Sequence, residues 1–542
     1  MQRRITSGGT KTRGVTGKLR AAAAACVTAM ALDAGAVAAQ TPVAGGTLNF
    51  GVVAEPANYD CHASSSFALI HPIAPHYSLL VKFDARHYPS VIPDLAEHWS
   101  VSADGLTYIF KIRRGVTFHD GSSLTSADIK ASYERIINPP PGVVSVRRTY
   151  YAGIDRIETP DPFTVVFTLK TPTAGMLEAF ASPFNCIYSA ARLKENPRYP
   201  EAEILGTGPF TFAEHIKGAS WTGRRFGNYF MPGRPYLDGY KAFFVKPQGV
   251  VPGILGGQFD AEFSSRTPPE EVQLRDKMKT DLTVHEGHGL SNLSIIFNTQ
   301  RKPFNDVRVR QALSMAIDRW GGAAALSKIS PLKYVGGIMR PGYAMALPET
   351  ELVKLPGFSR DVDAARERAK KLLAAAGIEN LKFKLLNRDS PRAFAPGASY
   401  VVDQWHRIGV TAEQEPLDNA RYQDLLGSAD FDVAIGLQVN AVDDPTAQFA
   451  TVLSRRASAS GFSGHADTHI DELFAKQQHM LDQAQRTLIV NDMERYALVQ
   501  AYSVPLLWWQ RIVVYHKKIQ GWYMTPSPYL GQDLSTVWLD ER

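Results

Sequence analysis

Segments with the two-residue period of β-strands alternate with segments of helical period along most of the chain, and this alternation limits the fold most. Residues 106–112 (LTYIFKI) alternate apolar and polar side chains, as a half-buried strand does. Residues 361–376 carry apolar side chains at helical spacing, and Gly377 follows where a left-handed C-cap belongs. We expect further strands at 47–53, 163–169, 381–386, 431–437, 506–515 and 536–539, and further helices at 126–137, 306–317, 401–408 and 470–502. Such alternation is typical of mixed sheets covered by helices, an α/β fold.

The N-terminus has the pattern of an export signal. Residues 1–20 contain basic side chains and no acidic ones, and a largely apolar stretch at 21–38 follows. Small residues then precede Gln40, as at a signal-peptidase cleavage site. We therefore predict a signal peptide at 1–39 and a periplasmic mature protein. Cys26 does not indicate a lipid anchor, because too few apolar residues precede it, and the pattern leaves Sec and twin-arginine export open.

The charge of the chain belongs mainly to this leader. The full sequence has 59 basic and 53 acidic residues, for a net charge of +6. Residues 1–39 hold six basic residues and one acid, so the remainder has 53 basic against 52 acidic residues, a net charge of +1. A nearly neutral chain without a basic run lacks the clustered Lys and Arg that bind nucleic acid or an anionic membrane.

Two cysteines remain after cleavage, Cys61 and Cys186. In an oxidising compartment such a pair can form one disulfide, and the alternative is two buried thiols. No CxxC spacing suggests a zinc site. His285 and His288 are three residues apart, but the interleaved Gly287 and Gly289 favour a loop rather than a metal-binding helix face. We expect no metal and no cofactor.

The motifs of common enzyme classes are missing or incomplete. Ser330-Pro331-Leu332-Lys333 matches the SxxK pattern of penicillin-recognising enzymes, but Pro331 disfavours the helix that the pattern needs, and no KTG motif accompanies it. The sequence also lacks a GxSxG elbow, a phosphate-binding GxxxxGK[ST] loop and an HExxH motif. We therefore expect a binding protein and not an enzyme. In the strand-like segment after Pro505, Trp508 and Trp509 should face opposite ways, one into the core and the other toward a cleft.

Several segments in conserved order resemble the family 5 extracellular solute-binding proteins, the large binding proteins of peptide-type ABC importers. They are 95–108 (LAEHWSVSADGLTY), 113–128 (RRGVTFHDGSSLTSAD), 206–210 (GTGPF) with 228–238, and 297–319, which includes PFNDVRVRQAL. The resemblance spans about residues 45–540. Most of these residues read as turns, caps and core positions, so they identify the fold rather than the ligand site.

The resemblance implies a two-lobed periplasmic binding protein (Venus-flytrap) fold with mixed sheets and an enlarged first lobe. Lobe I is expected to span 44–286 and 505–542, and lobe II 287–504. A monomer would enclose a small organic solute, a peptide or a peptide-like molecule, and deliver it to ABC permease subunits in the inner membrane. The alternatives are a metallophore or haem carrier of the same family, an exported hydrolase, and a sensor that signals through a membrane receptor.

The predicted ligand contacts are Ser65, Ser66 and Phe67 in lobe I and Arg392, Phe394, Asn440 and Asp443 in lobe II. Some dipeptide binders of the family have a similar Arg-x-aromatic-x-Pro loop, which implies that Arg392 meets a ligand carboxylate; its planar fork suits that group. The alternative is a solvated surface arginine. The family's peptide binders place an aspartate where this chain has Ala441, four residues before Pro445. We therefore expect an anionic ligand, while a free peptide amine lacks its usual partner unless Asn440 or Asp443 substitutes.

Overall fold

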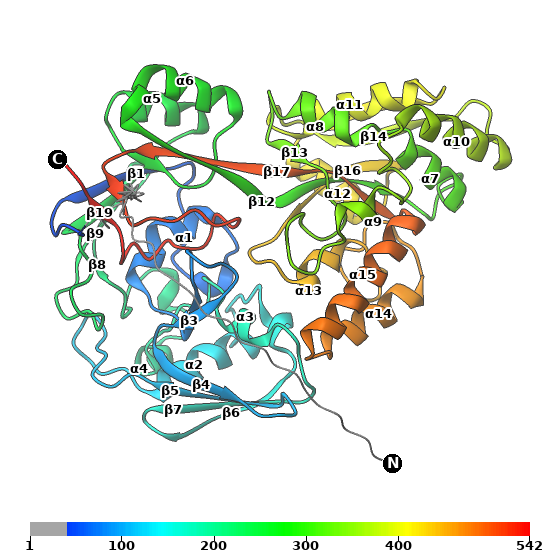
Figure 1. The fold of residues 1–542 in the computed structure, drawn as a ribbon. Helices are drawn as coiled ribbons and strands as arrows, with labels where there is room; N and C mark the ends of the chain where they lie inside the picture. The colour runs from blue at the N-terminus through cyan, green and yellow to red at the C-terminus, as the bar shows by residue number, and fades with distance from the viewer. Residues whose placement is uncertain (1–40, 542) are drawn as a thin grey trace, which may run out of the picture. The chain divides into compact units, whose positions relative to one another are not determined.

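The structure is a computed structural model that describes residues 41–541, and its largest feature is a mixed sheet of 11 strands (Figure 1). The predicted signal peptide lies outside the described residues. The strand order is β15 (Thr411–Leu417), β14 (Lys382–Arg388), β16 (Val433–Val439), β12 (Leu282–Phe297), β17 (Ser503–His516), β11 (Ala261–Glu262), β1 (Thr47–Val52), β10 (Gly239–Phe244), β9 (Ser220–Arg225) and β8 (Phe210–Ile216), with β13 (Leu332–Tyr334) also paired to β17.

The antiparallel pair β12 and β17 connects the two ends of this sheet. The two strands have 16 and 14 residues and extend between the helices α5 and α6 at one end and α7 and α11 at the other (Figure 1). His285 and His288 lie within β12, so the prediction of a loop there is wrong. Pro505, expected to end a helix, lies inside β17 beside an irregularity in the β12 register. A proline cannot donate to the ladder, which is why it sits at such a position.

A second, antiparallel sheet has the order β4 (Ala96–Val101), β5 (Thr107–Ile112), β7 (Thr164–Leu169) and β6 (Ile154–Asp161). Helix α2 (Ser126–Ile137) packs on β6 and β7 and begins with a capping box formed by Thr125 and Asp128. Two short sheets complete the strands: β2 (Val81–Phe83) with β3 (Val91–Pro93), and β18 (Ile519–Gln520) with β19 (Trp538–Leu539).

The larger helices follow the sequence pattern with two corrections. The helices expected at 306–317 and 361–376 are α7 (Val307–Met315) and α10 (Val362–Ala375), and Asp306 and Asp361 cap them. The helix predicted at 401–408 is α11 (Phe394–His406), which starts earlier. The single helix predicted at 470–502 is instead α14 (Thr468–Gln478) followed by α15 (Gln483–Gln500), because Asp482 caps a new helix.

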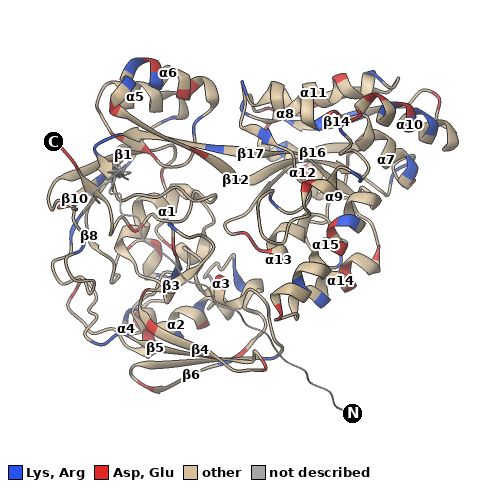
Figure 2. Cartoon of the chain, in the orientation of Figure 1, with Lys and Arg blue, Asp and Glu red and all other residues tan. Residues whose placement is uncertain are grey.

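The described chain has nine further α-helices. They are α1 (Phe67–Ile73), α3 (Met176–Phe180), α4 (Ala190–Glu195), α5 (Val250–Leu255), α6 (Pro268–Met278), α8 (Arg319–Leu326), α9 (Glu349–Leu352), α12 (Asn419–Gly427) and α13 (Pro445–Gln448). Basic and acidic residues are interspersed along the helices (Figure 2), in keeping with the nearly neutral charge of the chain after the leader.

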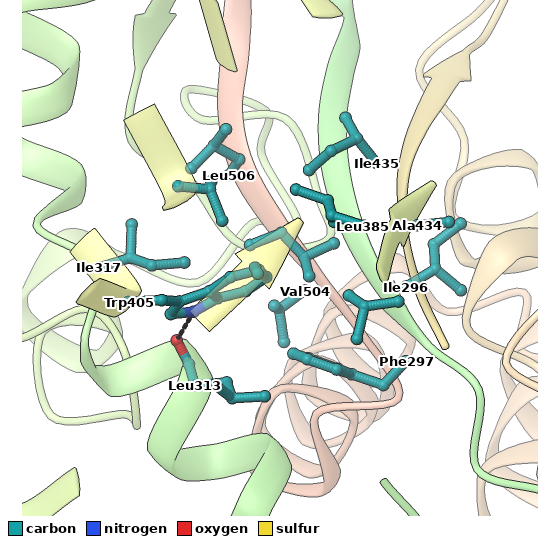
Figure 3. Close-up of a cluster of buried hydrophobic side chains, with 14 of the residues drawn as sticks. Ile296, Phe297, Leu313, Ile317, Leu385, Trp405, Ala434, Ile435, Val504 and Leu506 are labelled. Atoms are coloured by element: carbon teal, nitrogen blue, oxygen red, sulfur yellow. Dashed lines mark hydrogen bonds between the residues drawn. The ribbon is translucent and has the colours of Figure 1, made fainter. Parts of the chain in front are cut away.

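The hydrophobic cores divide the described chain into two parts. Three cores take their buried side chains from residues 48–274 and 512–539. Two others take theirs from residues 293–507. Figure 3 shows part of the largest, where the buried Trp405 indole donates to the Leu313 carbonyl oxygen at 2.8 Å. The two long strands β12 and β17 contribute to cores of both parts.

Cys61 and Cys186 are buried and joined by a disulfide in the first part. Beside them lies the buried ion pair of Arg135 and Asp60, with 2.7 Å between Nη2 and Oδ2. Burial lowers the pKa of the neighbouring His62 to about 3, despite the opposing effect of Asp60. The disulfide therefore ties the segment before α1 to the chain that follows α3.

Candidate functional site

A cleft of about 620 Å³ lies between the two parts of the described chain. Residues 146–184, with Ser65 and Tyr529, form one wall, and residues 439–478 form the other. Helix α3 belongs to the first wall, while α13 and α14 contribute to the second (Figure 1). Its volume falls within the range of about 300–1,000 Å³ that small-molecule sites occupy.

A second cavity is smaller, about 140 Å³, and lies within the first part of the chain. Its lysine, Lys82, is held between Asp533 at 2.6 Å and Asp94 at 3.6 Å. Its volume is below that of typical ligand sites. The larger cleft is therefore the candidate functional site.

Most ionised groups that line the cleft already have partners. Asp444 caps α13 and accepts from Arg486 at 2.9 Å. Arg147 donates from Nη2 to the carbonyl oxygens of Cys61 and Ser64, at 2.5 and 2.6 Å. Glu178 on α3 has no ion pair or hydrogen bond to another residue among those described. Burial raises the pKa of Glu178, the negative charge of Asp444 raises it further, and Arg486 opposes this.

Hydrogen bonds join the two walls at one edge of the cleft. The Ala174 amide donates to the Gln478 carbonyl oxygen at 2.7 Å, and the His479 ring meets the Pro172 carbonyl oxygen at 2.7 Å. Gly175 lies so close to Asp444 that a Cβ on this glycine would be 2.8 Å from the carboxylate oxygen Oδ2. The structure thus has the two parts closed against each other along this edge.

Two of the seven predicted ligand residues, Ser65 and Asn440, line this cleft. The Asn440 Nδ2 atom is buried and has no partner in the part of the chain that the structure describes. Ser66 accepts from the Ala68 amide as the N-cap of α1, and Phe67 packs against the first part's core. These last two side chains serve the fold in the structure.

The structure gives Phe394 and Asp443 structural partners as well. Phe394 is the first residue of α11 and is buried, 3% exposed, against the ring of Tyr422. Asp443 forms a buried ion pair with Arg340 at 2.8 Å, and its amide donates to the hydroxyl of Tyr88, in the first part of the chain, at 2.7 Å. The Asp443 carboxylate is therefore already neutralised by a cation of the chain.

Arg392 reaches from the second part of the chain to the first. It donates from Nη2 to the Ser265 carbonyl oxygen at 3.0 Å, and its Nε is buried without a partner among residues 41–541. Burial lowers the pKa of Arg392, and the nearby Arg266 lowers it further, while Glu262 opposes this. Trp509 lies 6.0 Å from the guanidinium. The arginine is thus a half-buried cation with an unused donor, and not a solvated surface residue.

The two tryptophans of β17 face opposite sides, as expected. Trp508 is fully buried and donates from Nε1 to the Gly337 carbonyl oxygen at 2.9 Å. Trp509 is partly exposed. The residues that sequence reasoning missed are Glu178 and the Asp444–Arg486 pair, since nothing in their local pattern marks them; tertiary packing alone brings them together.

The described residues offer no apparatus for the alternative chemistries. Ser330 donates to the Leu326 carbonyl oxygen and Lys333 pairs with Glu286, so the SxxK residues do not act together. Within residues 41–541, no group of three or more His, Cys, Asp or Glu side chains is placed to hold a metal ion. The same residues include no helix long and apolar enough to cross a membrane.

Residues 90–460 match the model of the bacterial extracellular solute-binding proteins, family 5. Di/tripeptide-binding protein 2 of Pseudomonas aeruginosa is 28% identical over 517 residues, which cover 90% of this chain and 92% of the relative. The glutathione-binding protein GsiB of Escherichia coli K12 is 24% identical over 445 residues, covering 80% of this chain and 83% of the relative.

Solved structures have the same fold. The binding protein AgaA of A. tumefaciens R10, in complex with agropinic acid, is 25% identical with a TM-score of 0.74, and the match covers 92% of this chain and 99% of that chain. The periplasmic binding protein DppA of Helicobacter pylori, in complex with the peptide STSA, is 22% identical with a TM-score of 0.73 and the same coverage. The α/β fold with its large mixed sheet is thus that of the two-domain periplasmic binding proteins.

Proposed function

Because the chain belongs to family 5 of the bacterial extracellular solute-binding proteins, we propose that its 620 Å³ cleft captures a small organic solute for an ABC importer. The chain is a binding protein and not an enzyme. One observation carries the proposal: the walls of the cleft belong to two parts with separate cores, joined by β12 and β17. A ligand that touches both walls favours the closed arrangement, which permease subunits then recognise.

We assign the two parts to two lobes, 44–286 with 505–542 and 287–504. The buried side chains of β17 bear on the point where the chain passes from the second lobe back to the first. Val504, Leu506 and Leu507 pack in the core of the second lobe, whereas Ile512 and Val513 pack in cores of the first. These contacts support a return of the chain to the first lobe within β17.

The solute that we propose is a peptide or peptide-like molecule with an anionic group. Relatives named for di- and tripeptides and for glutathione, and a structural neighbour with agropinic acid, support this class. Arg392 supports the anionic group: it does not line the cleft itself, but a carboxylate that reached it would pair with its unused Nε donor. The metallophore and haem-carrier alternative is not favoured, because neither the relatives' names nor the side chains of residues 41–541 point to a metal.

We also propose that the signal peptide at 1–39 directs export and that the mature protein is a monomer. The family is periplasmic. A mature N-terminus near Gln40 follows from the small residues before it. N-terminal sequencing of periplasmic material tests the cleavage, and a sequence that still begins at Met1 would contradict it.

Mass spectrometry of the solute that co-purifies with the protein tests the proposed function, and calorimetry with that solute tests Arg392. The Arg392→Ala variant should bind it at least tenfold more weakly, because hydrogen bonds between charged groups contribute about 1.5–3 kcal/mol. The matched control is Arg421→Ala, on the exposed surface of α12. Equal affinity of wild type and Arg392→Ala would remove Arg392 from the site.

A further inference from the structure

Three charged side chains line the cleft, those of Arg147, Glu178 and Asp444. Asp444 lies on the second wall and is neutralised by Arg486, which does not itself line the cleft. On the first wall, the Arg147 guanidinium is engaged with two backbone carbonyl oxygens. Glu178 shares that wall, and among the described residues it has no ion-pair or hydrogen-bonding partner other than its own amide. The Glu178 carboxylate is therefore partly buried and unpaired among the described residues, and the nearby Arg486, which favours its ionised form, already pairs with Asp444.

We propose that Glu178 is a ligand-binding residue that holds a cationic group of the solute, such as a primary ammonium. The inference rests on the proposed function, because it places the solute in the same cleft. A carboxylate that is withdrawn from water and unpaired is costly, and an ammonium restores the lost interaction through a charge-assisted hydrogen bond. Glu178 lies on α3 in the first wall, and Asn440 and Asp444 line the opposite wall. The contact between the Glu178 carboxylate and the ligand ammonium therefore comes from the first lobe.

With this contact, the expected ligand is a zwitterion rather than an anion. Ala441 provides no acid on the second wall, and Asp443 is paired with Arg340. Glu178 supplies the acidic group from the opposite wall, so a free amine has a partner in this cleft after all. The raised pKa of Glu178 fits a carboxylate that is poorly stabilised until a cation arrives.

Native mass spectrometry can test the role of Glu178 with two probes, an equimolar tripeptide mixture and the same mixture N-acetylated. Wild type should retain the free-amine peptides about tenfold better than the acetylated ones. Glu178→Gln should reduce retention of the free-amine peptides about tenfold and abolish the preference, and Glu178→Asp should restore part of it. Glu413→Gln, on the exposed face of β15, is the matched control and should behave as wild type. Circular dichroism melts establish that the variants fold.

Three results are decisive. Equal retention of both mixtures by wild type would overturn the ammonium contact, as would an unchanged preference in Glu178→Gln. In both cases peptide binding itself, and so the proposed function, would stand. Retention of neither mixture by wild type would overturn the zwitterionic ligand together with the proposed peptide class.

Discussion

Among single residues, His76 shows how burial selects one form of a side chain. It is fully buried, its Nδ1 contacts the Phe210 carbonyl oxygen at 2.8 Å, and its Nε2 lies 2.8 Å from the Trp221 indole nitrogen. An indole N–H can only donate, so Nε2 accepts and Nδ1 carries the proton. Burial lowers the pKa of His76 to about 3, which keeps the ring neutral.

We predict that His76→Phe lowers the free energy of unfolding by about 3 kcal/mol, because the Trp221 indole and the Phe210 carbonyl oxygen lose a buried partner. Urea unfolding at pH 7 measures the loss. His98→Phe, at an exposed position of β4, is the control and should change stability by less than about 0.5 kcal/mol. A His76→Phe variant as stable as this control would contradict the assigned hydrogen bonds.

At the scale of elements, helix α15 holds the loop that precedes α9. Glu494 on α15 is fully buried and accepts from the amides of Met339 and Leu347, at 2.8 and 2.9 Å. This loop includes Arg340, which pairs with Asp443 beside the cleft. Burial raises the pKa of Glu494 to about 7, although the backbone amides oppose this.

The raised pKa of Glu494 predicts a pH dependence of stability. Its folded-state pKa of about 7 is above the ordinary glutamate value of 4.5, so the native state holds the proton more tightly than the unfolded state. The contribution of Glu494 to the free energy of unfolding is therefore largest below about pH 4.5. It falls as the pH rises through about 7, by about 3 kcal/mol in total.

Urea unfolding of wild type and Glu494→Gln at pH 5 and pH 8 measures this effect. The stability advantage of wild type should shrink between the two pH values, because glutamine does not titrate. The buried histidines, such as His76 and His119, have lowered pKa values that make stability fall toward acid instead. Their contribution is the same in both proteins and cancels in the comparison. An advantage that stays constant, or grows toward pH 8, would show that Glu494 does not titrate in this range.

At the scale of the whole molecule, the disulfide links distant parts of the first lobe. Cys61 and Cys186 are 125 residues apart in sequence. In the chain-entropy model a loop of this size stabilises by about 4–5 kcal/mol. We expect the Cys61→Ala/Cys186→Ala double variant to lose up to about 4 kcal/mol in urea unfolding. Dithiothreitol during unfolding should reduce the stability of wild type and leave that of the double variant unchanged. Equal stability of wild type with and without reductant would contradict a stabilising disulfide.

The sequence by itself determined those features whose causes are local. The helical spacing of residues 361–376 and the alternation of residues 106–112 predict elements that the structure confirms, because such a period acts within a few residues. The family signatures also gave the fold. Local pattern was insufficient at 470–502, where Asp482 caps a second helix, and at His288, where pairing with β17 overrides the flanking Gly287 and Gly289.

Only the tertiary structure decided the state of the polar residues around the cleft. Asp443 and Phe394 read as ligand contacts in sequence, but Arg340 neutralises the first and a core buries the second. Glu178 carries no local signal, and its proposed role follows from its lack of a pairing partner among residues 41–541, in a cleft whose opposite wall lies more than 250 residues farther along the chain. Whether a charge is paired depends on every group that packs around it, and sequence spacing does not encode those long-range neighbours.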